Sequence, residues 1–283
     1  MSTHLTELLK APSGSIDLSM FDSRATPGFD GTKRDAPHLM EKLGKRLAEE
    51  QERLYAGGRS GTDERRMLLV LQGMDTSGKG GVIRKAVGLI DPQGLAIRSF
   101  KKPTAEELSH DFLWRMKNAL PEPGILGIFD RSHYEDVLIG RVRKLVDGAE
   151  IERRYGSINT WEKELSGSGV TIVKCFLHIS TDDQLGRLQE RLNRPDKYWK
   201  YNPGDVDDRK LWGDYRQAYE IAIERCNSAE APWFIVPSGR KWYRNWAVAT
   251  LLAEHLGAMN LEWPKADFDV EIEKSRLATT KPK

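Results

Sequence analysis

Residues 67–80 read MLLVLQGMDTSGKG, and this stretch decides the fold. The wholly apolar run Met67–Leu71 is typical of a strand that is buried on both faces of a parallel sheet. The next residues, Gly73–Lys79, match the spacing G-x-x-x-x-G-K of a phosphate-binding loop. We expect a helix to follow, with an apolar face made of Val82, Ile83, Val87 and Ile90. The order of strand, glycine-rich loop and helix is the context that a phosphate-binding loop requires.

The residue types of the loop explain how it would bind phosphate. Glycines let the backbone approach phosphate oxygens, and successive N–H groups form a concave anion site. Lys79 adds a mobile positive charge, and the predicted phosphate contacts are Gly73, Thr76, Ser77, Gly78 and Gly80. The alternative is a tight turn without a ligand. Gly80 stands where such loops usually carry a Ser or Thr that binds Mg²⁺. We therefore expect Asp75 to bind the metal, since hard cations prefer carboxylate oxygens; its alternative is a turn residue.

The remaining chain alternates between strand and helix patterns. Further strands are expected at residues 95–100, 125–129, 170–179 and 233–236, and helices at 35–55 (ended by Gly57 and Gly58), from 104 (buried face Leu108, Phe112 and Met116) and at 242–256. This alternation predicts an α/β fold, a three-layer α/β/α sandwich with a parallel central sheet. We expect an N-terminal extension over residues 1–65, a core over 66–260 and a C-terminal tail over 261–283. Within this tail, residues 274–283 are expected to form a frayed end.

A second polar cluster follows the predicted strand at 125–129. Asp130 stands at its carboxyl end, where α/β proteins bind ligands, and can hold Mg²⁺ directly or through water. Arg131 can grip a phosphate with two hydrogen bonds. Glu135 can reach the metal's waters or a substrate group, or be structural, and we expect His133 to pack rather than act as a base. The alternative for Asp130 and Arg131 is a surface ion pair.

A basic segment over residues 187–206 is predicted to form a helical lid. Arg187, Arg191 and Arg194 have helical spacing, and we expect Leu185, Leu188 and Leu192 to face the core. Pro195 ends the helix, and a loop with Lys197 and Lys200 follows. The lid would exclude water and neutralise a phosphoryl group in transfer; the alternative is a solvated helix end. Arg84 and Lys85, directly after the phosphate loop, are further candidates for phosphate contact.

Composition narrows the classes of function. The formal net charge is only +2, so any polyanion site must come from a local cluster of Lys and Arg. Cys175 and Cys226 lack the spacing of a zinc site or a disulfide framework, and we expect both to be core residues in a reducing compartment. The chain shows no signal-peptide pattern and no apolar run of membrane-spanning length, so a cytoplasmic location is expected.

These motifs resemble the family-2 polyphosphate kinases, P-loop kinases related to thymidylate kinase. The similarity runs from about Phe21 to Leu256. It rests on Gly73–Gly80, on residues 129–137 (FDRSHYEDV), on residues 187–200 with their arginines, on Ala231-Pro232-Trp233 and on Asn245-Trp246. The missing Ser or Thr after Lys79 is itself a trait of this family.

The resemblance implies reversible, Mg²⁺-dependent phosphoryl transfer between inorganic polyphosphate and nucleoside mono- or diphosphates, with Mn²⁺ as a substitute metal. AMP and ADP are the expected acceptors, with GMP and GDP as further candidates. It implies metal contacts by Asp75 and Asp130, phosphate binding by Lys79 and Arg131, and a lid around Arg191. It also implies a homodimer or homotetramer and no nucleic-acid or membrane partner. Two alternatives stay open: a nucleotide or nucleoside kinase that uses ATP, and a non-catalytic nucleotide or phosphate sensor.

Overall fold

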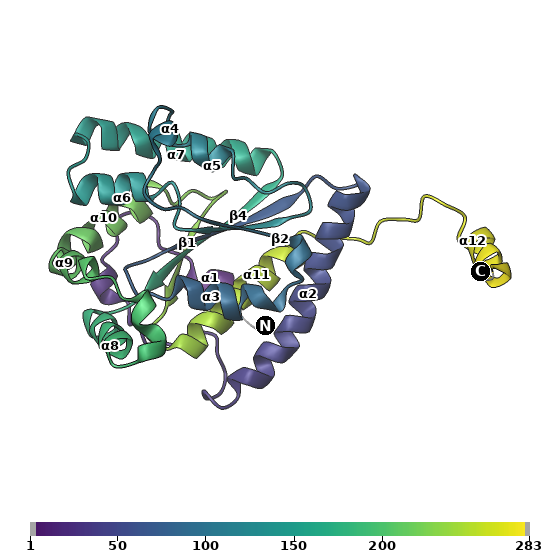
Figure 1. Ribbon diagram of the computed structural model, residues 1–283, viewed down its shortest axis with the longest axis horizontal. Coiled ribbons are helices and arrows are strands. Elements are labelled where there is room, and N and C mark those ends of the chain that lie inside the picture. The colour runs from purple at the N-terminus through teal and green to yellow at the C-terminus, as the bar shows by residue number, and fades with distance from the viewer. Residues whose placement is uncertain (1–3, 281–283) are drawn as a thin grey trace.

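A five-stranded sheet lies between two layers of helices in the computed structural model, which describes residues 4–280 (Figure 1). All strand pairs are parallel, in the order β2-β3-β1-β4-β5. The strands are β1 (Arg66–Gln72), β2 (Leu95–Ser99), β3 (Leu126–Asp130), β4 (Val170–His178) and β5 (Trp233–Pro237). The predicted three-layer α/β/α fold is therefore confirmed.

Twelve α-helices occur among the described residues. They are α1 (Leu5–Leu9), α2 (Ala36–Ser60), α3 (Lys79–Lys85), α4 (Ala105–Leu108), α5 (Trp114–Lys117), α6 (Glu135–Val142), α7 (Gly148–Gly167), α8 (Thr181–Leu192), α9 (Gly204–Lys210), α10 (Trp212–Arg225), α11 (Lys241–Ala258) and α12 (Val270–Thr279). The central strand β1 supplies both cores: Leu69 and Leu71 pack with α2, α3 and α11, whereas Leu68 and Val70 pack with α6, α7 and α10. This two-faced burial is what its unbroken apolar sequence predicts.

Helix α2 does not end at Gly57 and Gly58, as the sequence suggested, but continues to Ser60. A Cβ on Gly58 would lie only 2.4 Å from the carbonyl oxygen of Pro123, so this glycine permits close contact between two backbones. Gly61, with a φ of 68°, provides the left-handed residue that ends the helix.

Three leucines expected to be buried are exposed, and part of the expected frayed end is helical. Leu108 is 69% exposed because α4 is a single turn and packs no apolar face inward. Leu185 and Leu192 are 41% and 49% exposed, and only Leu188 of that trio is buried. Residues 274–279, expected to be frayed, are helical as part of α12. Residues 281–283 of the expected frayed end lie outside the described part of the chain.

The N-terminal residues from His4 onward are tied to the body of the protein. Leu5, Leu9 and Leu18 are buried, and the backbone N–H groups of Leu5 and Thr6 each donate to the Glu254 carboxylate at 2.8 Å. Both cysteines are buried and unpaired, as expected. Within residues 4–280, none of the helices combines the length and the apolar character that spanning a membrane requires.

Lys174, in the middle of strand β4, is fully buried in a polar cluster between the sheet and α7. Its Nζ lies 2.6 Å from Glu162 Oε2 and 2.9 Å from the Tyr134 hydroxyl, and it donates to the carbonyl oxygen of Cys226. His133 Nε2 lies 3.1 Å from the other Glu162 oxygen. This cluster anchors the chain that follows β3 to α7 and β4.

Replacing Lys174 with methionine leaves the Glu162 carboxylate buried without its cation. We expect the free energy of unfolding to fall by about 3–5 kcal/mol. Urea unfolding of K174M measures this loss beside K163M, which removes an exposed lysine of the same region. A loss as small in K174M as in K163M would show that the buried pair does not stabilise the fold.

Candidate active site

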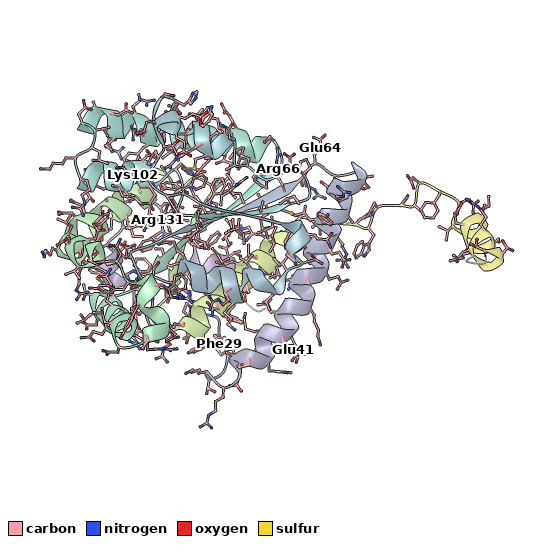
Figure 2. All side chains as sticks on the ribbon, viewed as in Figure 1. Phe29, Glu41, Glu64, Arg66, Lys102 and Arg131 are labelled. Atoms are coloured by element: carbon pink, nitrogen blue, oxygen red, sulfur yellow. The ribbon has the colours of Figure 1, made fainter. Side chains whose placement is uncertain are left out.

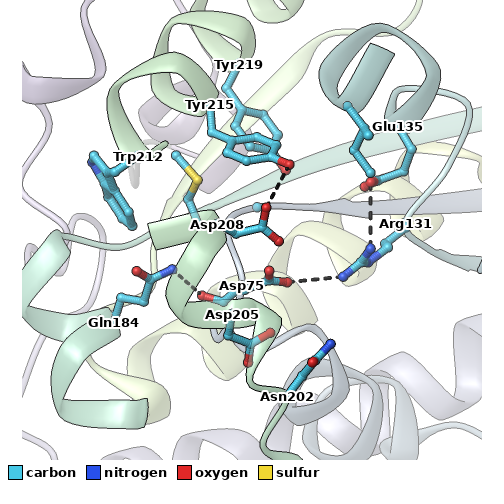
Figure 3. A pocket seen from close by; sticks show the side chains of 13 residues that line it. Asp75, Arg131, Glu135, Gln184, Asn202, Asp205, Asp208, Trp212, Tyr215 and Tyr219 are labelled. Carbon is cyan, nitrogen blue, oxygen red and sulfur yellow. Dashed lines mark hydrogen bonds and ion pairs between the residues drawn. The ribbon is translucent and has the colours of Figure 1, made fainter. Parts of the chain in front are cut away.

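The candidate site lies at the carboxyl edge of the sheet, where β1 and β3 are neighbours. Leu71 of β1 pairs with Asp130 of β3, so the loops that follow these two strands run side by side. Between them and α8 to α10 is a cavity of about 180 Å³ (Figure 3). Asp75 and Arg131 line it from the two loops, and Glu135 lines it from the first turn of α6. The structure thus brings together the two motifs that the sequence singled out.

The glycine-rich loop has the backbone of an anion site. Gly73, Thr76 and Gly78 all have positive φ angles, of 149°, 67° and 107°. Within the described chain, the backbone N–H groups of Gly78, Lys79 and Gly80 donate no hydrogen bond. Lys79 folds back so that its Nζ donates to the Gly73 carbonyl oxygen at 2.9 Å. Burial, followed by the nearby charge of Arg131, lowers the pKa of Lys79.

Arg131 links the two loops. Its guanidinium lies 3.1 Å from Asp75 Oδ1 and 3.8 Å from Glu135 Oε2, and its φ of 65° is unusual for a residue other than glycine. Burial works to lower the pKa of Arg131, but Glu135 and Asp75 outweigh it and the pKa is raised. Burial raises the pKa of Glu135 against the opposing charges of Arg131 and Lys79.

Asp75 and Asp130 are the carboxylates that could hold a divalent metal. Both are partly exposed and both act on Lys79 electrostatically, and Ser99 Oγ donates to Asp130 at 3.4 Å. No cluster of three or more His, Cys, Asp or Glu residues with metal-ligand geometry occurs in residues 4–280. Two carboxylates still fit Mg²⁺, which keeps water and phosphate oxygens as its other ligands.

The predicted lid helix is α8, followed by a 3-10 turn at Pro195–Lys200 and by α9. Arg191 bonds at 3.0 Å to Asp205, which lines the cavity. Arg194 lies beyond the end of α8 and pairs with Asp196 at 2.7 Å, while Lys197 pairs with Glu190. Three further predicted phosphate contacts, Lys200, Arg84 and Lys85, do not line the cavity. Lys200 stacks on Trp199, and Arg84 and Lys85 are exposed in the last turn of α3.

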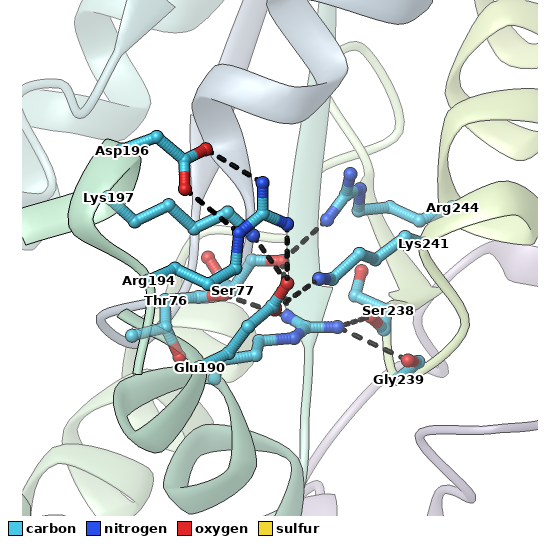
Figure 4. Close-up of polar contacts among 11 residues, drawn as sticks. Thr76, Ser77, Glu190, Arg194, Asp196, Lys197, Ser238, Gly239, Lys241 and Arg244 are labelled. Carbon is cyan, nitrogen blue, oxygen red and sulfur yellow. Dashed lines mark hydrogen bonds and ion pairs between the residues drawn. The ribbon is translucent and has the colours of Figure 1, made fainter. Parts of the chain in front are cut away.

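Arg187 is placed behind the glycine-rich loop. Its guanidinium donates to the carbonyl oxygens of Thr76 at 2.8 Å and Ser77 at 3.0 Å, and to those of Ser238 and Gly239 (Figure 4). Arg187 thus binds backbone carbonyl groups of the loop. A direct contact of Arg187 with phosphate stays a prediction.

Sequence reasoning missed the wall of the cavity that α9 and α10 form. Asp205 and Asp208 face Asp75 across it in Figure 3, and the Tyr215 hydroxyl donates to Asp208 at 3.3 Å. Burial and the charge of Asp75 raise the pKa of Asp205. The acidic run at 205–208, directly after Pro203-Gly204, is a signal that could have identified this wall.

Comparison with known proteins identifies a family. Residues 32–264 match the model of polyphosphate kinase 2. The chain is 43% identical over 256 residues to the AMP/ADP-polyphosphate phosphotransferase of Meiothermus ruber, covering 90% of this chain and 94% of that protein. It is 37% identical to the ADP-polyphosphate phosphotransferase of Rhodopseudomonas palustris, covering 88% and 89%. The crystal structure of polyphosphate kinase 2 from Arthrobacter aurescens superposes with a TM-score of 0.95 at 48% identity, covering 99% of this chain and 98% of that one.

The two arginines that flank the end of α8 differ in their placement, and we expect them to differ in effect. Arg191 is 22% exposed and bonds to Asp205 of the cavity wall, whereas Arg194 is 51% exposed and faces solvent. Arginines that neutralise a phosphoryl group in transfer contribute about 10³- to 10⁵-fold, so R191Q should lower kcat/KM by about 100-fold or more. R194Q should change kcat/KM by less than about threefold. Steady-state kinetics of both variants test this, and equal losses would refute the assignment of Arg191 to the site.

Proposed function

The chain belongs to the polyphosphate kinase 2 family, and we propose that its glycine-rich loop and cavity transfer a phosphoryl group between inorganic polyphosphate and a nucleoside mono- or diphosphate. AMP and ADP are the proposed nucleotides, as in the names of the relatives from M. ruber and R. palustris. GMP and GDP, reversibility of the transfer, a cytoplasmic location and assembly of two or four chains stay predictions.

The observation that carries this proposal is the set of unused donors around the loop. The N–H groups of Gly78, Lys79 and Gly80 have no acceptor among residues 4–280. The hydroxyl groups of Thr76 and Ser77 are buried there without a hydrogen-bond partner. Buried polar groups normally have partners. A chain of phosphate oxygens lying over the loop would supply acceptors for the three backbone N–H groups at once.

The roles of the charged residues follow from the chemistry of phosphate. A nucleotide's terminal phosphate has a second pKa of about 6, so the attacking oxygen is already largely ionised at neutral pH and no strong general base is required. The chain's own contribution is positioning and charge neutralisation. Lys79 and Arg131 would hold phosphate oxygens, and Arg191 would close over them.

Asp75 and Asp130 would hold Mg²⁺, which would neutralise charge on the phosphates when bound. Gly80 supports this choice, because the position after Lys79 offers no hydroxyl to a metal. Around Lys79 the described structure places three carboxylates, those of Asp75, Glu135 and Asp130, which would repel an anion unless cations balance them. A phosphate chain with its metal would restore that balance.

One assay separates the proposal from its two rivals. We expect the purified chain with Mg²⁺, polyphosphate and AMP or ADP to form the nucleotide that carries one more phosphate, and EDTA to abolish the reaction. Chromatography of the nucleotides measures the product. Transfer from ATP without transfer from polyphosphate would instead identify a nucleotide kinase that uses ATP. Binding of polyphosphate without turnover would identify a sensor.

A further inference from the structure

A second arginine, Arg244, lies behind the glycine-rich loop, and neither the loop motif nor the proposed reaction assigns it a role. It belongs to the first turn of α11 and is 3% exposed. Its Nη1 donates to the carbonyl oxygen of Ser77 at 3.2 Å, and its Nη2 donates to Asn245 Oδ1 at 2.8 Å. Figure 4 shows Arg244 reaching toward Ser77.

Arg244 packs closely beneath the loop against two of its glycines. A Cβ on Gly78 would lie 1.7 Å from Arg244 Nη1, and a Cβ on Gly81 would lie 2.5 Å from Nη2. By contrast, a Cβ on Gly80 would meet no atom within 4 Å. Gly78 also has a left-handed backbone, but Gly81 does not. A side chain at position 81 would therefore have to displace the guanidinium of Arg244.

The charge of Arg244 is not balanced by a carboxylate. Within residues 4–280, Arg244 forms no ion pair within 4.0 Å, and its guanidinium bonds only to the Ser77 carbonyl and the Asn245 amide. Arg187 also has no carboxylate within 4.0 Å there, although Asp183 and Glu190 act on it electrostatically. Burial and the positive charge of Arg187 lower the pKa of Arg244 to about 9, which leaves it charged at neutral pH. Buried charges are normally paired. The Arg244 guanidinium therefore adds a positive potential at the loop that an anion on the other face would relieve.

We infer that Arg244 is a positioning residue for polyphosphate: it holds the Ser77 carbonyl behind the loop, so that the N–H groups of Gly78–Gly80 face the phosphates, and its charge strengthens their binding. The inference rests on the proposed role of the loop as the polyphosphate site. Arg244 acts through the loop, since its nitrogens bond to the Ser77 carbonyl and to Asn245 on the protein side.

The first test separates charge from packing. We expect R244Q to weaken binding of tripolyphosphate by about tenfold or more, since hydrogen bonds to charged groups contribute about 1.5–3 kcal/mol, while R244K retains part of the affinity. Isothermal titration calorimetry measures the Kd, and thermal unfolding confirms that each variant is folded. R225Q, which removes an exposed arginine paired with Glu152, is the matched control and should bind like the original chain.

The second test uses the close fit of Gly81 against Arg244. We expect G81A to weaken tripolyphosphate binding in the original background, because the new methyl group displaces the guanidinium. In an R244A background the same change should have little further effect, since the space is vacated. Added guanidinium should restore binding to R244A by at least severalfold, whereas urea, its neutral counterpart of similar shape, should not.

Equal Kd values for the original chain and R244Q would overturn the inference, and so would equal rescue of R244A by urea and guanidinium. If R244A does not fold, the comparison of R244K with R244Q still decides the question. Failure of the original chain to bind tripolyphosphate would instead refute the proposed role of the loop. The two failures are therefore distinguishable.

Discussion

A loop that aims its N–H groups at an anion must turn its carbonyl groups the other way, and those carbonyls need donors of their own. In this protein two arginines from distant parts of the chain meet that requirement. Arg187 of α8 bonds to the carbonyls of Thr76 and Ser77, and Arg244 of α11 bonds to Ser77. The phosphate-facing backbone thus depends on donors that belong to the opposite face of the loop.

The parallel sheet explains how so many charges meet at one edge. The pairing of β1 with β3 places Gly73 and Arg131 after neighbouring strands, and α9 and α10 close the cavity over them. Positive groups (Lys79, Arg131) and negative groups (Asp75, Glu135) share this edge, and burial makes their balance matter more. The buried Lys174 cluster fixes the chain after β3 from below, so the position of Arg131 also depends on the core.

The sequence was most informative where one short segment determines both structure and chemistry. The apolar run before Gly73 predicted a central buried strand, and the spacing of Gly73, Gly78 and Lys79 predicted the loop; the structure has both. Asp130, at the carboxyl end of β3, was likewise expected beside the loop. These signals are local, and parallel topology alone brings them together.

Features that depend on distant contacts were not predictable in the same way. The glycine at position 58 resembled a helix end, but its role is to contact the backbone near Pro123. Arg187 has the spacing of a lid residue, yet in the fold its guanidinium donates hydrogen bonds to backbone carbonyls of the loop. Arg244 belongs to no motif, because its role arises only when α11 packs beside the loop. Asp205 lies in an acidic run, but only the packing of α9 places that run at the cavity.

The central claim is that the free N–H groups of residues 78–80 bind the phosphate chain. Nuclear magnetic resonance of ¹⁵N-labelled protein with and without tripolyphosphate tests it most directly. The account predicts that the amide signals of Gly78, Lys79 and Gly80 shift most and exchange more slowly with solvent. Shifts confined to exposed cations such as Arg84 and Lys85, with the loop signals unchanged, would contradict it.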